Sequence, residues 1–142
     1  MTENTPPSIF PTLRYRDAEA ALEWLKQAFG FTEHVVYRND DGVIEHGELT
    51  YGSGMIMFGQ HRDDGFVDPS GDPKTSPVGL YVVIDDADAH HARAVAAGAE
   101  IVRDLEDQAY GSRDYSARDL DGNLWSFGTY SPYAVAPEPA TA

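Results

Sequence analysis

The sequence predicts an α+β fold built from two βαβββ modules, and three observations lead to this prediction. A helix-opening motif occurs twice, as Asp17-Ala-Glu-Ala20 and as Asp86-Ala-Asp-Ala89. Each copy follows a short apolar stretch and precedes three further stretches of strand-like composition. The two halves also end alike, in Met57-Phe58-Gly59 and in Ser126-Phe127-Gly128. A length of 142 residues suits one domain that buries a core without disulfides.

In the first half we expect a strand over Ile9–Tyr15, then a helix that begins after Asp17 and ends at Gly30. Asp17 can accept a hydrogen bond from the first helical turn, and Gly30 can adopt the left-handed conformation that ends a helix. The expected helix carries apolar residues at helical spacing, namely Ala18, Ala21, Leu22, Leu25 and Phe29. Three strands are predicted to follow, over Thr32–Arg38, Ile44–Tyr51 and Met55–Gly59.

The second half repeats this order. A strand over Val78–Ile84 precedes a helix that begins after Asp86 and ends near Gly98, with His91 on its thinner apolar stripe. His91 is therefore expected to lie in the core or at an interface. The strands that follow are predicted over Ile101–Leu105, Arg113–Arg118 and Leu124–Tyr130. Asp119-Leu-Asp-Gly-Asn123 predicts a tight turn between the last two, because Asp and Asn bond their own backbone and Gly accepts a positive φ.

Composition sets the expected boundaries. Residues 1–8 and 132–142 lack periodicity and are expected to be tails, and residues 60–77 are rich in Gly and Pro and are expected to be a linker. The first module then spans residues 9–59 and the second spans residues 78–131.

Charge and cysteine usage exclude several classes of function. Ten basic against 24 acidic residues give a formal charge of −14, so nucleic acid and anionic membranes are poor partners. The acidity favours solubility, and it would also concentrate a cationic ligand. The absence of cysteine excludes disulfides and thiolate chemistry. Without a long apolar run or a signal-peptide pattern, we expect a cytoplasmic protein.

The closing hairpin carries a family resemblance. Tyr110-Gly-Ser-Arg-Asp-Tyr115, followed by Arg118-Asp-Leu-Asp-Gly-Asn-Leu-Trp-Ser-Phe127, resembles the glyoxalase-like branch of the vicinal oxygen chelate superfamily, the glyoxalase, bleomycin-resistance and extradiol dioxygenase group. The resemblance covers about residues 8 to 131. It implies half-barrel sheets around a cavity, with modules that pair within the chain or across a homodimer. It does not define a reaction, because one fold hosts many chemistries.

The resemblance also implies where a metal would bind, on the first and fourth strands of each module. These positions fall near Phe10 and Gly79 and on Met57 and Ser126. None of the four supplies the imidazole or carboxylate that a divalent metal prefers. We therefore expect no metal at this site and no cofactor.

Two sets of side chains are candidates for a functional site. Tyr110, Arg113, Tyr115 and Trp125 are predicted to bind a ligand, because an arginine beside aromatic rings can hold a carboxylate or stack on a planar molecule. The alternative is that Arg113 pairs with an acid and the aromatic residues fill the core. His46 and Glu48 share a strand face and are candidate catalytic residues, as a displaced metal site or a base with its orienting group.

The expected function is therefore binding of a small organic molecule, partly aromatic or cationic, without metal, as in the drug-sequestering proteins of the group. The alternative is a metal-dependent lyase, isomerase or dioxygenase of glyoxalase type that uses His46 and Glu48. A third possibility is a protein-interaction module.

Overall fold

The structure is a computed structural model that describes residues 7, 9–62 and 78–132. Most of the predicted tails and most of the predicted linker lie outside these described residues, and the predicted module boundaries stay predictions.

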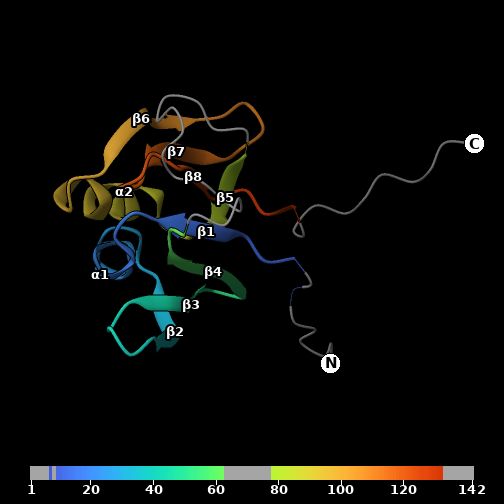
Figure 1. Cartoon of the computed structure of the whole chain (residues 1–142). Helices are drawn as coiled ribbons and strands as arrows, with labels where there is room; N and C mark the ends of the chain where they lie inside the picture. Colours follow the sequence, from blue (N-terminus) through green and yellow to red (C-terminus); the bar gives the residue numbers. More distant parts are fainter. Residues whose placement is uncertain (1–6, 8, 63–77, 133–142) are drawn as a thin grey trace, which may run out of the picture.

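Two similar modules make up the described chain (Figure 1). The first contains β1 (Thr12–Tyr15), α1 (Ala18–Phe29), β2 (Thr32–Arg38), β3 (Ile44–Tyr51) and β4 (Gly54–Gln60). The second contains β5 (Gly79–Val83), α2 (Ala87–Ala96), β6 (Glu100–Asp107), β7 (Arg113–Arg118) and β8 (Leu124–Gly128). The sheets have matching strand orders, β1-β4-β3-β2 and β5-β8-β7-β6, and the first strand of each runs parallel to the fourth. The predicted α+β fold of two βαβββ modules is confirmed, and neither sheet closes on itself.

The predicted helix ends are confirmed. The carboxylates of Asp17 and Asp86 accept hydrogen bonds from the backbone N–H groups of Ala20 and Ala89, at 3.1 and 3.0 Å. Gly30 ends α1 with a φ of 81°, in the left-handed region where a Cβ is disfavoured. Among the described residues, neither helix is long and apolar enough to cross a membrane.

The first strand is shorter than expected. β1 starts at Thr12, and the side chain of Ile9 is 86% exposed. Pro11 has no backbone N–H to donate to a neighbouring strand, although its carbonyl still accepts a hydrogen bond from Met57 at 2.9 Å. The expected strand over Leu124–Tyr130 likewise ends early, at Gly128.

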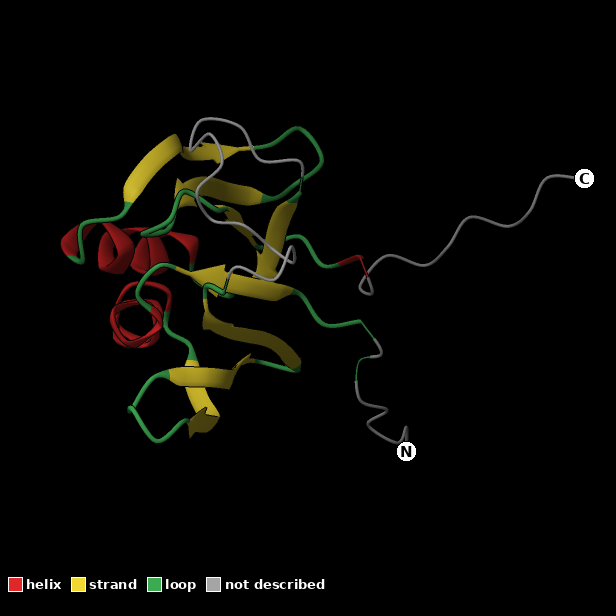
Figure 2. Ribbon diagram, viewed as in Figure 1, coloured by secondary structure: helices red, strands yellow, loops and turns green. Residues whose placement is uncertain are grey.

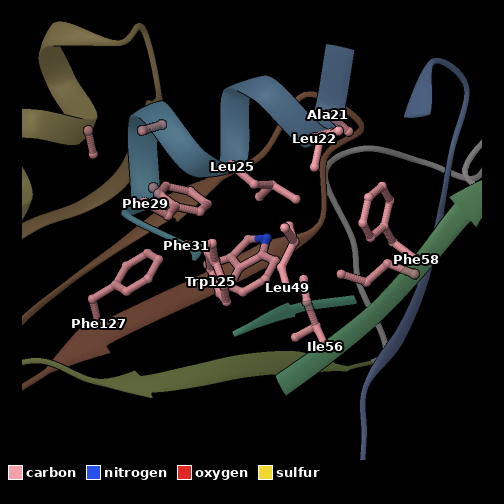
Figure 3. Close-up of a cluster of buried hydrophobic side chains, with 14 of the residues drawn as sticks. Ala21, Leu22, Leu25, Phe29, Phe31, Leu49, Ile56, Phe58, Trp125 and Phe127 are labelled. Atoms are coloured by element: carbon pink, nitrogen blue, oxygen red, sulfur yellow. The ribbon is translucent and has the colours of Figure 1, made fainter. Parts of the chain in front are cut away.

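The core lies between the two modules, with the helices side by side on one side of the molecule (Figure 2). The fully buried Phe29 at the end of α1 reaches the second module, where its ring centre lies 4.7 Å from that of Phe127 and 5.4 Å from that of Trp125. Figure 3 shows side chains of α1 and of β4 converging on Trp125 from the first module. The modules therefore share one core.

Each helix ends against groups of the other module. Trp24 of α1 donates from its indole nitrogen to the carbonyl of Ala97, just after α2, at 3.0 Å. Arg93 of α2 donates to the carbonyls of Gln27 and Lys26 in the last turn of α1, at 2.8 and 3.0 Å. The last carbonyls of a helix have no partner within the helix, so these side chains satisfy groups that would otherwise need water.

Candidate functional site

A pocket of about 560 Å³ lies between the two modules, on the side where the described chain begins and ends. From the first module it is lined by Phe31 and by the segment 51–56, which forms the β3–β4 turn and the start of β4. From the second it is lined by residues 80–83 of β5 and by Trp125 of β8. The volume falls within the usual range of pockets for small organic molecules.

Aromatic rings form the inner wall of the pocket. The ring of Phe31 meets those of Tyr51 and Trp125 edge to face, with centroid distances of 5.6 and 5.5 Å. Trp125 is fully buried in the protein, while Tyr51 is half-buried. Such edge-to-face contacts fix the orientations of the rings, and among these three rings it is Tyr51 that keeps exposed surface for a molecule that enters.

The lining carries no formal charge. None of its 17 described residues is Asp, Glu, Lys, Arg or His, although such residues are common elsewhere in the chain. The side chains that line it are mostly aliphatic or aromatic, and Ser53 and Ser131 are the serines among them. The pocket is therefore better suited to an apolar part of a ligand than to an ion.

Trp125 is held in place by the predicted turn between β7 and β8. Gly122 in this turn has a φ of 84°, and its N–H donates to the carbonyl of Asp119 at 3.0 Å, which confirms the turn. The carboxylate of Asp119 accepts from the indole nitrogen of Trp125 at 2.9 Å and from the hydroxyl of Tyr15 at 2.7 Å. Burial, together with the charge of Asp119, holds the pKa of Tyr15 well above its ordinary value, so the phenol stays protonated and donates. The carboxylate of Asp119 thus joins Trp125, which lines the pocket, to Tyr15 of the first module.

The four predicted ligand-binding residues do not all meet at this pocket. Trp125 lines it, but Tyr110, Arg113 and Tyr115 are not among the described lining residues. Tyr110 is 63% exposed, and its hydroxyl lies 3.3 Å from the carboxylate of Asp114. The shared ligand-binding role of the four residues stays a prediction.

Arg113 lies between two carboxylates. Its guanidinium donates to both oxygens of Asp88, at 3.1 and 3.0 Å, and to Asp107 at 3.2 Å. These hydrogen bonds with Asp88 and then Asp107 raise the pKa of Arg113 above its ordinary value. A bidentate pair of this kind orients the arginine toward α2.

Tyr115 points into the core and pairs with a histidine that the sequence did not single out. Its hydroxyl lies 2.6 Å from Nδ1 of His90, and Nε2 of His90 lies 3.0 Å from the carbonyl of Phe29. Since a carbonyl can only accept, Nε2 carries the proton, and Nδ1 of the neutral ring accepts from Tyr115. Burial lowers the pKa of His90 and raises that of Tyr115, so both groups are neutral in the fold.

The predicted apolar stripe of α2 missed the more deeply buried histidine: His90 is buried, while His91 is partly buried and its ring meets that of Tyr115 edge to face at a centroid distance of 5.0 Å. The buried residues of α2 are Ala87, His90 and Ala94, whereas Val95 is 49% exposed. The buried face of the helix is therefore rotated from the expected stripe. His91 instead places Nε2 at 2.9 Å from a carboxylate oxygen of Asp104.

The burial of His90 predicts acid sensitivity. Its pKa is lower in the fold than in the unfolded chain, so the unfolded state takes up the proton more readily. The stability contributed by the neutral ring is present above about pH 6.5, the ordinary value, and is lost as the pH falls toward the lowered folded value. We expect the free energy of unfolding, measured with urea, to fall as the pH is lowered from about 7 to about 5. In His90→Gln this dependence on pH should be weaker, because the buried imidazole is gone. His91→Gln is the matched control, and an unchanged slope in His90→Gln would contradict the assignment.

His46 and Glu48 are not among the described lining residues of the pocket, and they lie on the face of β3 opposite to that of the buried Leu49. Their Nε2 and Oε2 atoms are 2.8 Å apart, and both side chains are partly exposed. His34 places Nε2 at 3.9 Å from the same carboxylate, and the ring of Tyr37 stacks on His46 at 6.2 Å. The geometry allows Glu48 to orient the imidazole, and the catalytic role of the pair stays a prediction.

Met57 and Ser126, two of the positions where the resemblance implies that a metal would bind, make other contacts. Met57 pairs across the sheet with Thr12 on one side and Glu48 on the other. Ser126 shares a hydrogen bond of 2.7 Å with Ser116 and pairs with Tyr81. Within the described ranges, no three His, Asp, Glu or Cys side chains are grouped so that they could hold a metal ion.

The pocket residues Phe31, Tyr51, Ile56 and Leu80 were not predicted as site residues. A signal was present in β5, where Leu80, Tyr81, Val82 and Val83 form an apolar run rather than an alternation of apolar and polar residues. Such a run indicates that both faces of the strand contact apolar surroundings.

Comparisons with known proteins agree with this architecture. Residues 9–127 match the family described as the Glyoxalase/Bleomycin resistance protein/Dioxygenase superfamily. An uncharacterized protein from Mycobacterium tuberculosis is 30% identical over 131 residues, which cover 90% of this chain and 77% of that protein. The crystal structure of TioX from Micromonospora sp. ML1 is 32% identical with a TM-score of 0.70, and the match covers 93% of this chain and all of TioX.

A more distant structure shares the fold alone. The bleomycin resistance determinant encoded on transposon Tn5 is 22% identical with a TM-score of 0.62, and the match covers 86% of this chain and 96% of that one. The matched family and the relatives above 30% identity cover nearly the whole described chain. The chain belongs to the Glyoxalase/Bleomycin resistance protein/Dioxygenase superfamily.

Proposed function

We propose that this protein binds a small organic molecule in the pocket between its modules, without a metal ion. The observation that carries the proposal is a pocket of about 560 Å³ whose described lining residues carry no charge and include the aromatic residues Phe31, Tyr51 and Trp125. Apolar pockets with few polar groups are the usual sites for organic ligands. The absence of a grouped metal-ligand set among the described residues leaves binding by shape and apolar contact.

The biological role that we infer is sequestration of a bioactive compound. Two proteins of the same fold are named for antibiotic resistance, the bleomycin resistance determinant of Tn5 and the fosfomycin resistance protein FosX from Mesorhizobium loti. A protein that binds such a compound lowers its free concentration without any chemical step. The described residues around the pocket offer no carboxylate, imidazole or cationic group for catalysis at the ligand.

A variant with a larger side chain in the pocket should bind the ligand less tightly. Leu80 lines the pocket and pairs with Trp125 across the parallel strands, so Leu80→Trp places a large ring in the space that a ligand would occupy. Compounds that bind the folded state of the natural protein raise its melting temperature. We expect these compounds to bind the variant at least about tenfold less tightly, a loss of about 1.4 kcal/mol in binding free energy. The measurement is a thermal-shift screen of antibiotics and aromatic metabolites, followed by calorimetric titration.

The matched control for this variant is Val102→Trp. Val102 is 47% exposed on β6 and lies outside the pocket lining, so the same ring added there should leave binding unchanged. Binding that persists in Leu80→Trp but fails in Val102→Trp would place the ligand elsewhere.

The second candidate function is a metal-dependent enzyme of glyoxalase type, and the contact of 2.8 Å between His46 and Glu48 favours it. The same screen separates the two functions. Binding in the pocket should survive a chelator such as EDTA and the change His46→Gln. A ligand-induced shift or an activity that EDTA and His46→Gln both abolish would support the enzyme.

We also propose a homodimer. The edge strand β5 carries exposed apolar side chains where a surface strand usually carries polar ones, with Tyr81 43% and Val83 41% exposed and the adjacent Val78 68% exposed. Two copies with a charge of −14 each are expected to meet at an uncharged surface such as this one. We expect light scattering at micromolar concentration to give twice the mass of the chain, 15.6 kDa, from an interface well above roughly 1,000 Å² in total. Val78→Lys should shift the protein toward a monomer without changing a pocket residue, because Val78 is not among the described lining residues, whereas Tyr81 and Val83 are. A natural protein that is already monomeric would contradict the proposal.

A further inference from the structure

The charge-free lining also bears on which ligands the pocket can accept. We propose that the part of the ligand buried in this pocket is an uncharged aromatic group, an inference that rests on the proposed function. Three properties of the protein favour such a group: the lack of charge on the described lining residues, the hydrogen bonds that two of their polar atoms already make, and the net charge of −14.

Two of the three polar atoms on the aromatic side chains of the lining, those of Trp125 and Tyr81, are already engaged in hydrogen bonds. The indole nitrogen of Trp125 donates to Asp119 at 2.9 Å, and the hydroxyl of Tyr81 donates to the carbonyl of Tyr130 at 2.6 Å. These two donors are therefore not free to bind a polar group on a ligand. A ligand with many hydrogen-bonding groups would lose its bonds to water without replacing them.

A charged group would be disfavoured more strongly. No described lining residue carries a charge that could pair with it, so an ion would lose its hydration without compensation. A cation gains some attraction from an aromatic face, but this attraction is smaller than the cost of removing the cation from water into an apolar pocket. An anion is also repelled by the net charge of −14.

The geometry of the wall favours an aromatic group over an aliphatic one. The lining rings with exposed surface are those of Tyr51, which is half-buried, and Tyr81, which is 43% exposed, and Phe31 holds Tyr51 edge to face at a centroid distance of 5.6 Å. Aromatic rings gain from offset or edge-to-face contact with such a wall beyond the gain from buried area alone. A ligand can also carry a cationic substituent, which the acidic protein would attract while the substituent stays in water outside the pocket. Only the uncharged part of such a ligand would then enter the pocket.

Two pairs of fluorescent probes test this proposal on the full chain. N-phenyl-1-naphthylamine is uncharged, and 1-anilinonaphthalene-8-sulfonate has the same ring system with one negative charge. Acridone is uncharged, and 9-aminoacridine is a planar cation of similar size at pH 7. We expect each uncharged probe to bind once per chain and at least about tenfold more tightly than its charged counterpart, a difference of about 1.4 kcal/mol.

Variants locate the binding. Leu80→Trp should weaken the binding of N-phenyl-1-naphthylamine at least about tenfold, and Val102→Trp should leave it unchanged. Should Leu80→Trp fail to fold, as judged by circular dichroism, Val82→Phe replaces it, because Val82 lines the same pocket.

Each other outcome has a definite meaning. Equal affinity for a charged and an uncharged probe of one pair would overturn the ligand class and leave the proposed function standing. Failure of all four probes, together with a compound screen that raises no melting temperature, would overturn the proposed function itself. Tyr81 and Val83 belong both to the pocket lining and to the proposed dimer surface. An affinity for N-phenyl-1-naphthylamine that weakens as protein concentration rises would therefore show that the second copy covers the pocket, which overturns the ligand proposal and leaves the dimer standing.

Discussion

Replacing Asp119 with alanine is expected to lower the free energy of unfolding by about 3–5 kcal/mol. Its carboxylate accepts hydrogen bonds from the hydroxyl of Tyr15 and the indole nitrogen of Trp125, and both donors belong to fully buried side chains. It also accepts from the backbone and side-chain nitrogens of Asn123, which close the turn. Alanine leaves two buried donors without an acceptor, at about 1–3 kcal/mol each, and removes the turn contacts as well.

Urea unfolding of the variant measures this effect, with Leu120→Ala as the control. Leu120 lies in the same turn and is 49% exposed, so its truncation should change stability by less than about 0.5 kcal/mol. Tyr15→Phe removes one donor and leaves no buried donor unsatisfied, so we expect a smaller loss of about 1 kcal/mol. A loss below about 1 kcal/mol in Asp119→Ala would mean that water or a rearranged turn replaces the carboxylate.

Phe29→Ala is expected to lower the free energy of unfolding by about 3–5 kcal/mol, the range for truncation of a buried phenylalanine. Phe29 is fully buried at the end of α1, and its ring lies 4.8 Å from Trp24, 4.7 Å from Phe127 and 5.4 Å from Trp125, centre to centre. The cavity left by alanine would lie between the two modules, where rigid rings from both sides limit collapse (Figure 3).

Phe10→Ala is the matched control, because Phe10 is 36% exposed and precedes the first strand. Its truncation should cost less than about 1 kcal/mol. Equal losses for the two variants would indicate that the modules do not share the core that the structure describes. Phe29→Ala should also bind a pocket ligand less tightly, because the ring helps to position Trp125.

Much of the fold could be predicted from the sequence because its determinants are local. The capping aspartates Asp17 and Asp86 and the glycine Gly30 act within one helical turn, and the motif around them occurs twice. The turn 119–123 is likewise defined by its own residues. The start of β1 was predicted less well, because the alternation of apolar residues continues through Pro11, where backbone pairing is limited.

The candidate site was predicted less completely because it depends on packing between segments that are distant in the sequence. His90 and His91 are adjacent on one helix, and only the contact with α1 and β7 determines that His90 is buried. Arg113 resembles a ligand-binding residue in the sequence, but the partner carboxylate of Asp88 comes from α2. The pocket itself combines short segments of both modules, and no single motif marks it.

The exchange of helix caps between the modules restricts how the two repeats can change over evolution. Trp24 completes the end of α2, and Arg93 completes the end of α1. An insertion of one residue in either helix would rotate its capping side chain by about 100° and leave the carbonyls of the other repeat unsatisfied. The two copies of the repeat are therefore expected to diverge freely in their loops and outer strand faces, while each keeps the length of its own helix, 12 residues in α1 and 10 in α2.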